Sequence, residues 1–221
     1  MSKLSERISN MEWGFPSPGG IDKEDMEVLE TLVKEQISKV GFEVKIADVG
    51  CWTGMSTVTF ALASSQSHVS AIDWFKGSES TPLATAASDN TVKDVLKANL
   101  RYFDVMNRVN ILEDHSKEAA SKFVDNSFDI VFIDADHRYL NVLADLEAWW
   151  PKVKPGGFFC GHDCEFILDP KSKSWDFFAS TEDNPWNGED FIQFHPGVIR
   201  AVAEKFPKAK KLGQRIWMVQ K

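Results

Sequence analysis

Short apolar segments alternate regularly with amphipathic stretches along most of this 221-residue chain. The apolar segments, each of the length of a strand, are 45–50, 69–73, 109–112, 129–134 and 157–161. The stretches with a helical spacing of apolar residues are 22–41, 56–63, 92–103, 116–123, 140–150 and 196–206. Largely apolar strands that are each followed by a helix are typical of a parallel sheet covered on both faces. The sequence therefore predicts an α/β fold.

The regular alternation ends after Gly161, and residues 164–195 follow no clear period. The large aromatic residues of this segment include Trp175, Phe177, Phe178 and Trp186. We predict that 164–195 is an aromatic insertion that serves as a lid over the site, with a packed surface insertion as the alternative. Two short strands around residues 213–214 form a hairpin-like ending.

Charge and composition argue against several classes of partner. The net charge is −8 and no block of lysine and arginine is present, so nucleic acid is not expected as a partner. No secretory signal is visible at the N-terminus, and no apolar run approaches the roughly 18 residues of a membrane span. Three cysteines, an odd number, provide no disulfide framework. We therefore expect a cytoplasmic protein without a membrane partner; its oligomeric state stays open, with a homodimer as one alternative.

A glycine-containing loop follows the first apolar segment, in the sequence D-V-G-C-W-T-G-M-S at 48–56. Glycine lets a ligand approach the backbone closely, and ligands of open α/β sheets bind beyond the carboxyl ends of the strands. The dinucleotide fingerprint G-x-G-x-x-G is interrupted, because Trp52 takes the place of the middle glycine. The loop also lacks the Lys-Ser/Thr pair of a phosphate-binding P-loop. A ligand without phosphates, such as S-adenosylmethionine (SAM), fits this loop better.

Polar and aromatic residues at successive predicted strand ends extend this interpretation. Asp48 is placed to orient the ammonium end of SAM, and Asp73 to accept hydrogen bonds from its ribose hydroxyls. Trp74 offers a ring face for the adenine, whose edge residues 114–116 can meet. The residues that we expect to contact the cofactor are Asp48, Gly50, Trp52, Gly54, Ser56, Asp73, Trp74, Asp114, Ser116 and Asp134.

Two aspartates and a histidine follow the fourth apolar segment, in the sequence F-D-I-V-F-I-D-A-D-H-R-Y at 128–139. A structural explanation is a capping cluster for the helix that comes next, because aspartate is a favoured N-cap residue. We interpret Asp136 as that cap, and we expect Asp134 and His137 to face the ligand.

At these positions the chain resembles the class I SAM-dependent methyltransferases. More narrowly, it resembles methyltransferase family 24, which is related to metal-dependent O-methyltransferases of the catechol and caffeoyl-CoA type. The matching pieces are the segments 48–56, 71–77 (A-I-D-W-F-K-G), 128–139, 144–157 (A-D-L-E-A-W-W-P-K-V-K-P-G-G) and 161–163 (G-H-D). The resemblance implies a Rossmann-like seven-stranded sheet, mostly parallel, with helices on both faces and an antiparallel last strand. It also implies that 1–221 form a single methyltransferase domain, in which 1–41 are an N-terminal loop and helix.

The resemblance further implies a divalent cation near the cofactor. In the related enzymes, the acid that ends the fourth strand and two polar residues after the fifth strand hold the metal. The corresponding residues here are Asp134, His162 and Asp163. We expect Mg²⁺ or Mn²⁺, and the imidazole tilts the preference away from Mg²⁺ toward Mn²⁺, Fe²⁺ or Zn²⁺. The run C-G-H-D-C at 160–164 also suggests zinc, but it lacks the C-x-x-C spacing of structural zinc sites.

The predicted reaction is the transfer of a methyl group from SAM to a hydroxyl of a small molecule, of the sugar or natural-product type. A divalent cation on that hydroxyl lowers its pKa, and a nearby base removes the proton. We expect His137 as the base, with His162 as the second choice, and Asp134 as a further catalytic residue. Two alternatives come from other classes: an NAD(P)-linked oxidoreductase on a similar sheet, and a module that binds SAM without turnover.

Overall fold

The computed structural model describes residues 3–9, 20–77, 82–172, 175 and 194–221, which form strands and helices close to the predicted positions. The strands are β1 (Val44–Val49), β2 (Ser67–Asp73), β3 (Val109–Glu113), β4 (Phe128–Ile133), β5 (Val153–Gly161), β6 (Lys210–Leu212) and β7 (Ile216–Gln220). The helices are α1 (Lys3–Ser9), α2 (Lys23–Val40), α3 (Met55–Ala63), α4 (Pro82–Ala86), α5 (Val92–Tyr102), α6 (Ser116–Ser121), α7 (Tyr139–Trp149) and α9 (Pro196–Lys205). Short 3₁₀ turns cover Met106–Arg108 and Trp150–Lys152. Helices α1 and α4 were not predicted, because 7 and 5 residues are too few for a periodic signal.

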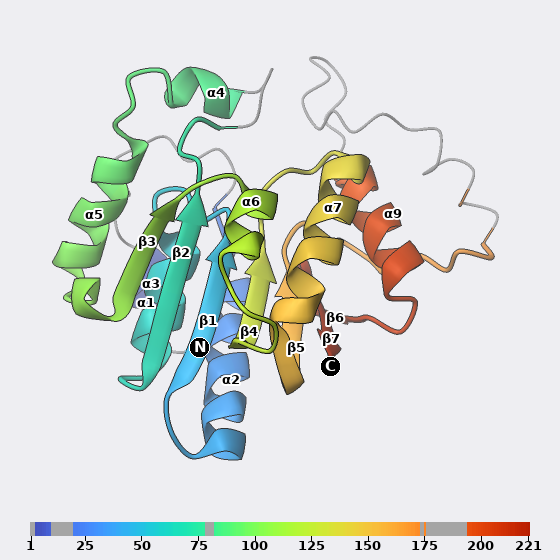
Figure 1. Ribbon diagram of the computed structural model, residues 1–221, viewed down its shortest axis with the longest axis horizontal. Coiled ribbons are helices and arrows are strands. Elements are labelled where there is room, and N and C mark those ends of the chain that lie inside the picture. The colour runs from blue at the N-terminus through green and yellow to red at the C-terminus, as the bar shows by residue number, and fades with distance from the viewer. Residues whose placement is uncertain (1–2, 10–19, 78–81, 173–174, 176–193) are drawn as a thin grey trace.

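Five parallel strands form the main part of a seven-stranded sheet, whose order is β3-β2-β1-β4-β5-β7-β6 (Figure 1). Strand β7 runs antiparallel to both of its neighbours, β5 and β6. This arrangement confirms the predicted Rossmann-like, mostly parallel sheet with an antiparallel last strand. The predicted hairpin-like ending is confirmed as well, since a short turn at residues 213–215 joins β6 to β7.

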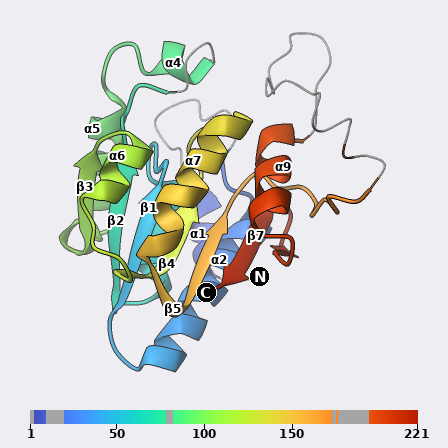
Figure 2. The same ribbon diagram turned by 45° about the vertical axis from the view of Figure 1, so that its right-hand side comes forward.

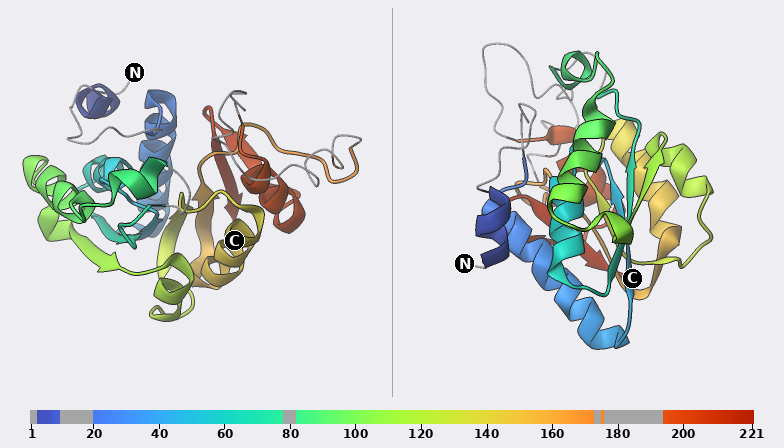
Figure 3. Two further views of the ribbon diagram at one scale, coloured as in Figure 1. Left: turned by 90° about the horizontal axis from the view of Figure 1, so that it is seen from above. Right: turned by 90° about the vertical axis from the view of Figure 1, so that its left-hand side faces the viewer.

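Helices cover both faces of the sheet, and alternate residues of each strand point to opposite layers. On β4, Ile130 and Phe132 belong to the apolar cluster with α1, α2, α3 and α5. Their neighbours Val131 and Ile133 belong to the cluster with α6, α7 and α9. Figures 2 and 3 show the two layers, with the blue helices α1 and α2 on one side and the yellow helix α7 on the other. Burial on both faces explains why residues 130–133 are apolar without interruption.

The chain order reverses between β1 and β4, which creates a switch point at the carboxyl ends of these strands. Strand β1 pairs with β2 on one side, whereas the chain returns after β3 to form β4 on the other side. Ligands of open α/β sheets bind at such a point. Residues 50–54, 134–138 and 162–165 follow β1, β4 and β5, so the fold brings these three segments to the upper edge of the sheet in Figure 1.

Two acids near the start of α2 connect this helix to the C-terminal hairpin. Asp25 is fully buried, and its Oδ1 accepts a hydrogen bond from the backbone N–H of Gln214 at 2.7 Å. Asp22 stands at the N-cap position, as predicted, but its side chain forms no cap hydrogen bond and instead pairs with Arg215 at 3.0 Å. The first long helix is therefore tied to the end of the chain by charge as well as by packing.

Most of the predicted aromatic insertion lies outside the described residues, so the lid hypothesis stays a prediction. Of the segment 164–195, the structure describes 164–172, Trp175 and 194–195. In the described part of the chain, no helix has both the length and the apolar character needed to cross a lipid bilayer.

Gly213, in the turn between β6 and β7, tests the contact with Asp25. Its φ is +54°, and a Cβ there would overlap the Asp25 carboxylate, whereas a Cβ on Gly41, at φ +73°, would meet nothing within 4 Å. Gly41→Ala therefore carries only the cost of a left-handed side chain, about 1–2 kcal/mol. We expect Gly213→Ala to lower the free energy of unfolding, measured by urea denaturation, by more than this control does. Equal losses in the two variants would contradict the importance of the contact.

Candidate active site

The glycine loop at residues 50–54 packs directly against the end of β4. The backbone N–H of Gly50 donates to the carbonyl of Ile72 at 2.8 Å, and a Cβ on Gly50 would overlap the carbonyl oxygen of Asp134. Gly54 has a φ of +95°, and a Cβ there would overlap the side chain of Leu96. Both positions therefore require glycine, which keeps the loop close to Asp134.

Asp48, at the buried end of β1, keeps one carboxylate oxygen without a partner. Its Oδ2 accepts hydrogen bonds from the hydroxyls of Ser56, at 2.8 Å, and Thr57. Its Oδ1 is buried and has no partner in the described part of the chain. Burial raises the pKa of Asp48 to about 7. An unsatisfied buried oxygen is costly, so this atom fits a ligand that carries a hydrogen-bond donor.

Asp73, at the end of β2, orders the glycine loop and the segment after β2. Its Oδ2 accepts a hydrogen bond from the backbone N–H of Trp52 at 2.8 Å, and its Oδ1 accepts one from the backbone N–H of Phe75 at 2.7 Å. Each carboxylate oxygen has a second lone pair, so both can still accept hydrogen bonds from a diol such as a ribose. The ring centroid of Trp74 lies 4.5 Å from that of His115, which belongs to the segment 114–116 that we expect at the adenine edge.

Asp114 and Ser116, predicted to meet the adenine edge, already have protein partners. Asp114 pairs with Lys122 at 2.7 Å, and the Ser116 hydroxyl accepts a hydrogen bond from the indole N–H of Trp149 at 2.9 Å. Trp149 is fully buried in the core. The Ser116 side chain therefore anchors α7 to α6, a role that its position in the sequence did not reveal.

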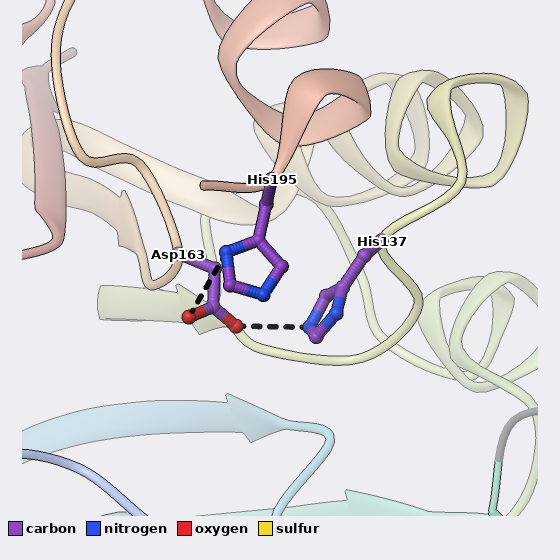
Figure 4. Close-up of side chains that lie close together, drawn as sticks. All are labelled: His137, Asp163 and His195. Atoms are coloured by element: carbon purple, nitrogen blue, oxygen red, sulfur yellow. Dashed lines mark ion pairs between the residues drawn. The ribbon is translucent and has the colours of Figure 1, made fainter. Parts of the chain in front are cut away.

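The carboxylate of Asp163 is the centre of a polar network at the end of β5. Its Oδ2 lies 2.9 Å from Nε2 of His137, and Figure 4 shows this pair together with His195. Its Oδ1 lies 3.2 Å from Nδ1 of His162, 3.1 Å from Nη1 of Arg215 and 3.6 Å from Nδ1 of His195. Asp163 has a φ of +55°, which is uncommon for a residue with a side chain. The four partners stabilise the residue in this conformation.

Carboxylates face both nitrogens of the His162 ring. Its Nε2 lies 3.2 Å from Oδ2 of Asp25, and its Nδ1 lies 3.9 Å from Oδ1 of Asp134. The side chain is only 3% exposed, so water does not compete for these contacts. One ligand atom each from Asp134, His162 and Asp163 lies within 4.8 Å of the other two. The structure thus brings together the three residues that the resemblance to metal-dependent enzymes singled out.

The surrounding carboxylates change the protonation of the two histidines. Burial disfavours the charged imidazole of His137, but the negative charges of Asp163 and Asp134 outweigh it and raise the pKa to about 9. The same balance of burial against Asp163 and Asp134 raises the pKa of His162 to about 10. Burial by itself would raise the pKa of Asp163, yet His162 and His137 hold it well below its usual range. Without a metal, both histidines are therefore imidazolium ions at neutral pH.

Four residues of this network carry no local signal in the sequence: Asp25, Glu165, His195 and Arg215. Asp25 and His162 are in contact although they are 137 positions apart. Glu165 holds His195 through two contacts, because it accepts a hydrogen bond from the backbone N–H at 3.0 Å and lies 2.8 Å from Nδ1 of the ring. Only the return of the chain through α9 and the hairpin brings His195 and Arg215 to the end of β5.

The structure decides two smaller points near the site. The interpretation of Asp136 as the cap of α7 was wrong, because Arg138 occupies the N-cap position. Asp136 instead accepts a hydrogen bond from the Arg138 backbone N–H at 2.7 Å, which forms a turn before the helix. Cys160 and Cys164 are buried and free. Burial raises the pKa of the Cys164 thiol to about 12, which opposes a thiolate ligand for zinc at 160–164.

A Rossmann-like sheet, with a glycine loop after β1, an acid at the end of β2 and polar residues after β4 and β5, is the arrangement expected of a class I SAM-dependent methyltransferase. Residues 47–164 match the profile of a family described as a methyltransferase domain, methyltransferase family 24. Because the match covers more than half of the chain, the chain belongs to this family and is a SAM-dependent methyltransferase. Among curated protein sequences, none matches the chain significantly.

Solved structures of O-methyltransferases share the fold at low sequence identity. A candidate caffeoyl-CoA O-methyltransferase from Staphylococcus aureus is 18% identical, with a TM-score of 0.65 over 100% of this chain and 93% of that chain. An O-methyltransferase from Bacillus cereus in complex with SAH is also 18% identical, with a TM-score of 0.63 over 100% and 92%. A candidate O-methyltransferase from Klebsiella pneumoniae is 17% identical, with a TM-score of 0.63 over 99% and 89%. At this identity the likeness shows the fold alone.

The raised histidine pKa values predict how the stability of the metal-free protein depends on pH. A histidine whose pKa is raised on folding contributes stability that is complete below its unfolded pKa, about 6.5, and is lost as the pH rises through its folded pKa. For His137 and His162 the loss therefore extends toward their folded pKa values of about 9 and about 10. We expect the melting temperature in EDTA to fall as the pH rises from about 6.5 to about 8.5.

A histidine outside the network provides the control for this measurement. His137→Gln should make the fall in melting temperature less steep, because one of the two contributing groups is removed. His68, on β2, has Glu43 as its partner at 3.4 Å, and His68→Gln should keep the wild-type slope. A melting temperature that does not change with pH in the wild-type protein would contradict the assigned protonation.

Proposed function

We propose that this methyltransferase transfers the methyl group of SAM to a hydroxyl oxygen of a small molecule, of the sugar or natural-product type, with the help of a divalent cation. The observation that carries the proposal is that Asp134, His162 and Asp163, which could hold a cation, lie beside the glycine loop. The Asp134 backbone packs against Gly50, and the Asp134 carboxylate belongs to the group with His162 and Asp163. Cofactor binding and activation of the acceptor would then take place at one edge of the sheet.

Features of the described residues support SAM as the ligand of the glycine loop. The unpartnered Oδ1 of Asp48 suits the ammonium group of SAM, and the two oxygens of Asp73 suit its ribose hydroxyls. We assign the face of Trp74 to the adenine. SAM, when bound, supplies a methyl group on a sulfonium that a nucleophile attacks in line. Because the charge on sulfur decreases during the transfer, the main contribution of these residues is alignment.

The donor set of Asp134, His162 and Asp163 fits a divalent cation. Two carboxylates and one imidazole suit Mn²⁺, Fe²⁺ or Zn²⁺ better than Mg²⁺. Asp25 faces Nε2 of His162, which leaves Nδ1 for a metal, and a carboxylate behind a metal-bound histidine is a common outer contact. A cation at this site has to displace the Nδ1 proton. A divalent cation, when bound, lowers the pKa of a hydroxyl that it contacts.

The raised pKa of His137 limits the general-base role that the sequence suggested for it. An imidazolium with a pKa of about 9 has no free lone pair at neutral pH, and its Nε2 faces the Asp163 carboxylate. A cation held by Asp134, His162 and Asp163 would lower the pKa of the hydroxyl enough for its proton to pass to water. We assign to His137 the positioning of the Asp163 carboxylate. Arg215 contacts the other oxygen of the same carboxylate and restricts it further.

A metal-free site is the second candidate mechanism for the same reaction. It is favoured by the contacts of His162, since both ring nitrogens already face carboxylates and a doubly protonated ring satisfies them without an ion. The oxidoreductase alternative is set aside, because the chain belongs to a methyltransferase family. A module that binds SAM without turnover is distinguished by an assay of methyl transfer.

Thermal shifts test the choice of cofactor. SAM and SAH should raise the melting temperature, since a ligand at one hundred times its Kd stabilises the native state by about 2.7 kcal/mol, whereas NAD(H) should have no effect. Asp73→Asn should reduce the shift, because it removes charge-assisted hydrogen bonds to the ligand. Asp125→Asn, an exposed acid paired with Lys152, is the matched control and should keep the full shift. Stabilisation by NAD(H) but not by SAM would contradict the assignment.

Chelation tests the metal. We expect EDTA to abolish methyl transfer to a panel of polyphenols and glycosides, while the thermal shift with SAM persists and Mn²⁺ or Mg²⁺ restores turnover. Asp134→Asn should lower turnover by at least about 100-fold, because loss of an outer contact alone costs up to about that much in metal affinity or activity. Full activity in excess EDTA would exclude the metal-assisted mechanism and favour the metal-free one. Methylation of amines or thiols, but of no hydroxyl, would overturn the proposed acceptor.

A further inference from the structure

A second group of metal-ligating side chains shares only Asp163 with the first group. His137, Asp163 and His195 each offer one ligand atom, and these atoms all lie within 4.8 Å of one another. Figure 4 shows the two imidazole rings and the carboxylate pointing toward one another. The three residues come from the segment after β4, the segment after β5 and the start of α9, so the group exists only in the folded chain.

Glu165 determines which nitrogen of His195 is available to the group. Its carboxylate lies 2.8 Å from Nδ1 of His195 and also accepts a hydrogen bond from the His195 backbone N–H at 3.0 Å. Nδ1 is closer to Glu165 than to Oδ1 of Asp163, which lies 3.6 Å away. A carboxylate only accepts hydrogen bonds, so we assign a proton to Nδ1 and the lone pair of the neutral ring to Nε2. Metal-bound histidines commonly have such a carboxylate behind them, because it fixes the tautomer and the orientation of the ring.

One distance within the group matches the spacing of ligand atoms around a small divalent cation. Ligand atoms about 2.1 Å from an ion are about 3.0 Å apart at adjacent corners of an octahedron and about 3.4 Å apart in a tetrahedron. Nε2 of His137 lies 2.9 Å from Oδ2 of Asp163. The ring centroids of His137 and His195 are 4.7 Å apart, and the ring planes cross at 72°. The rings are therefore not stacked face to face.

The second group is also easier to reach from solution than the first. The side chains of His137 and His195 are 28% and 16% exposed, whereas that of His162 is 3% exposed. A cation can therefore enter and leave at His137 and His195 without opening the core.

The charges around Asp163 are mostly negative. Five carboxylates are connected through the histidines and Arg215. They belong to Asp22, Asp25, Asp134, Asp163 and Glu165. Arg215 pairs with two of them, Asp22 and Asp163. Carboxylates thus outnumber the arginine that pairs with them, and this predominance of acidic side chains suits the binding of cations.

We propose that His137, Asp163 and His195 form a second divalent-cation site, in which Glu165 positions His195. Two imidazoles and one carboxylate favour Zn²⁺, Co²⁺, Fe²⁺ or Mn²⁺ over Mg²⁺ and Ca²⁺, which take oxygen ligands. An ion at this site connects the start of α9 to the ends of β4 and β5. The site does not depend on the identity of the acceptor, so it stands apart from the proposed methylation of a hydroxyl.

Cobalt binding to the full-length protein tests the second site. After treatment with EDTA and desalting, the protein is titrated with Co²⁺, and binding is followed by visible absorption and by calorimetry. We expect the wild-type protein to bind one equivalent more than His195→Ala does, and an equal concentration of Mg²⁺ not to displace that equivalent. Glu165→Gln keeps the size of the side chain and should weaken the same equivalent by about 10–100-fold, the usual effect of losing an outer carboxylate.

Two further variants serve as controls. His68→Ala removes a histidine that also has a glutamate partner, Glu43 at 3.4 Å, and should bind Co²⁺ like the wild type. Asp134→Asn should weaken Co²⁺ binding at the first site and retain the equivalent of Co²⁺ whose binding depends on His195. Circular dichroism and the thermal shift with SAM report whether each variant is folded. If His195→Ala does not fold, Glu165→Gln carries the test.

The outcomes separate the second site from the proposed function. Unchanged Co²⁺ stoichiometry and affinity in the folded His195 and Glu165 variants would overturn the site, as would a wild-type protein that binds no Co²⁺. Methyl transfer to the hydroxyl panel is measured in parallel. If the wild type shows turnover but binds no Co²⁺ that depends on His195, only the second site is overturned. If it binds that Co²⁺ but shows no turnover, only the proposed function is overturned.

Discussion

The Asp163 carboxylate is the interaction on which the rest of the site depends. A buried, isolated carboxylate is costly, so it has to be paired with positive or hydrogen-bonding groups. Its partners are His137 after β4, the adjacent His162, His195 at the start of α9, and Arg215 before β7. Removal of any one partner leaves the others facing an incompletely paired charge. Segments that are distant in the sequence are therefore held together by a single side chain.

The register of the parallel strands places this network beside the glycine loop. Ile133 pairs with Val49 of β1 and with Gly161 of β5. The residues that follow these three positions, Gly50, Asp134 and His162, therefore stand side by side at the carboxyl edge of the sheet. Because Gly50 has no Cβ, its loop packs against the Asp134 backbone without a gap. The proposed cofactor contacts and the proposed acceptor chemistry would then use the same short stretch of sheet edge.

The network can balance its negative charge in two ways, with protons on the histidines or with divalent cations. The first way makes imidazolium ions of His137 and His162, whose pKa values are raised to about 9 and about 10. The second way requires the cations to displace protons from the ring nitrogens that face them. Binding of a metal at these residues would therefore be coupled to the pH and to the stability of the protein, and each has to be measured with the others controlled.

The sequence by itself determined the parallel sheet, the glycine loop and the acids at the strand ends, because these features follow from local patterns of apolar and polar residues. Asp48, Asp73 and Asp134 could be placed at one edge because parallel strands end on the same side. Only the tertiary structure revealed Asp25 and His195, since no local pattern marks a residue whose partner is distant in the chain. Asp25, for example, is 137 positions from its partner His162. The hydrogen bond between Trp149 and the Ser116 hydroxyl, and the raised pKa of His137, could also be found only from the tertiary structure. The physical reason is that hydrogen-bond partners and burial are properties of packed side chains, which the order of residues along the chain does not specify.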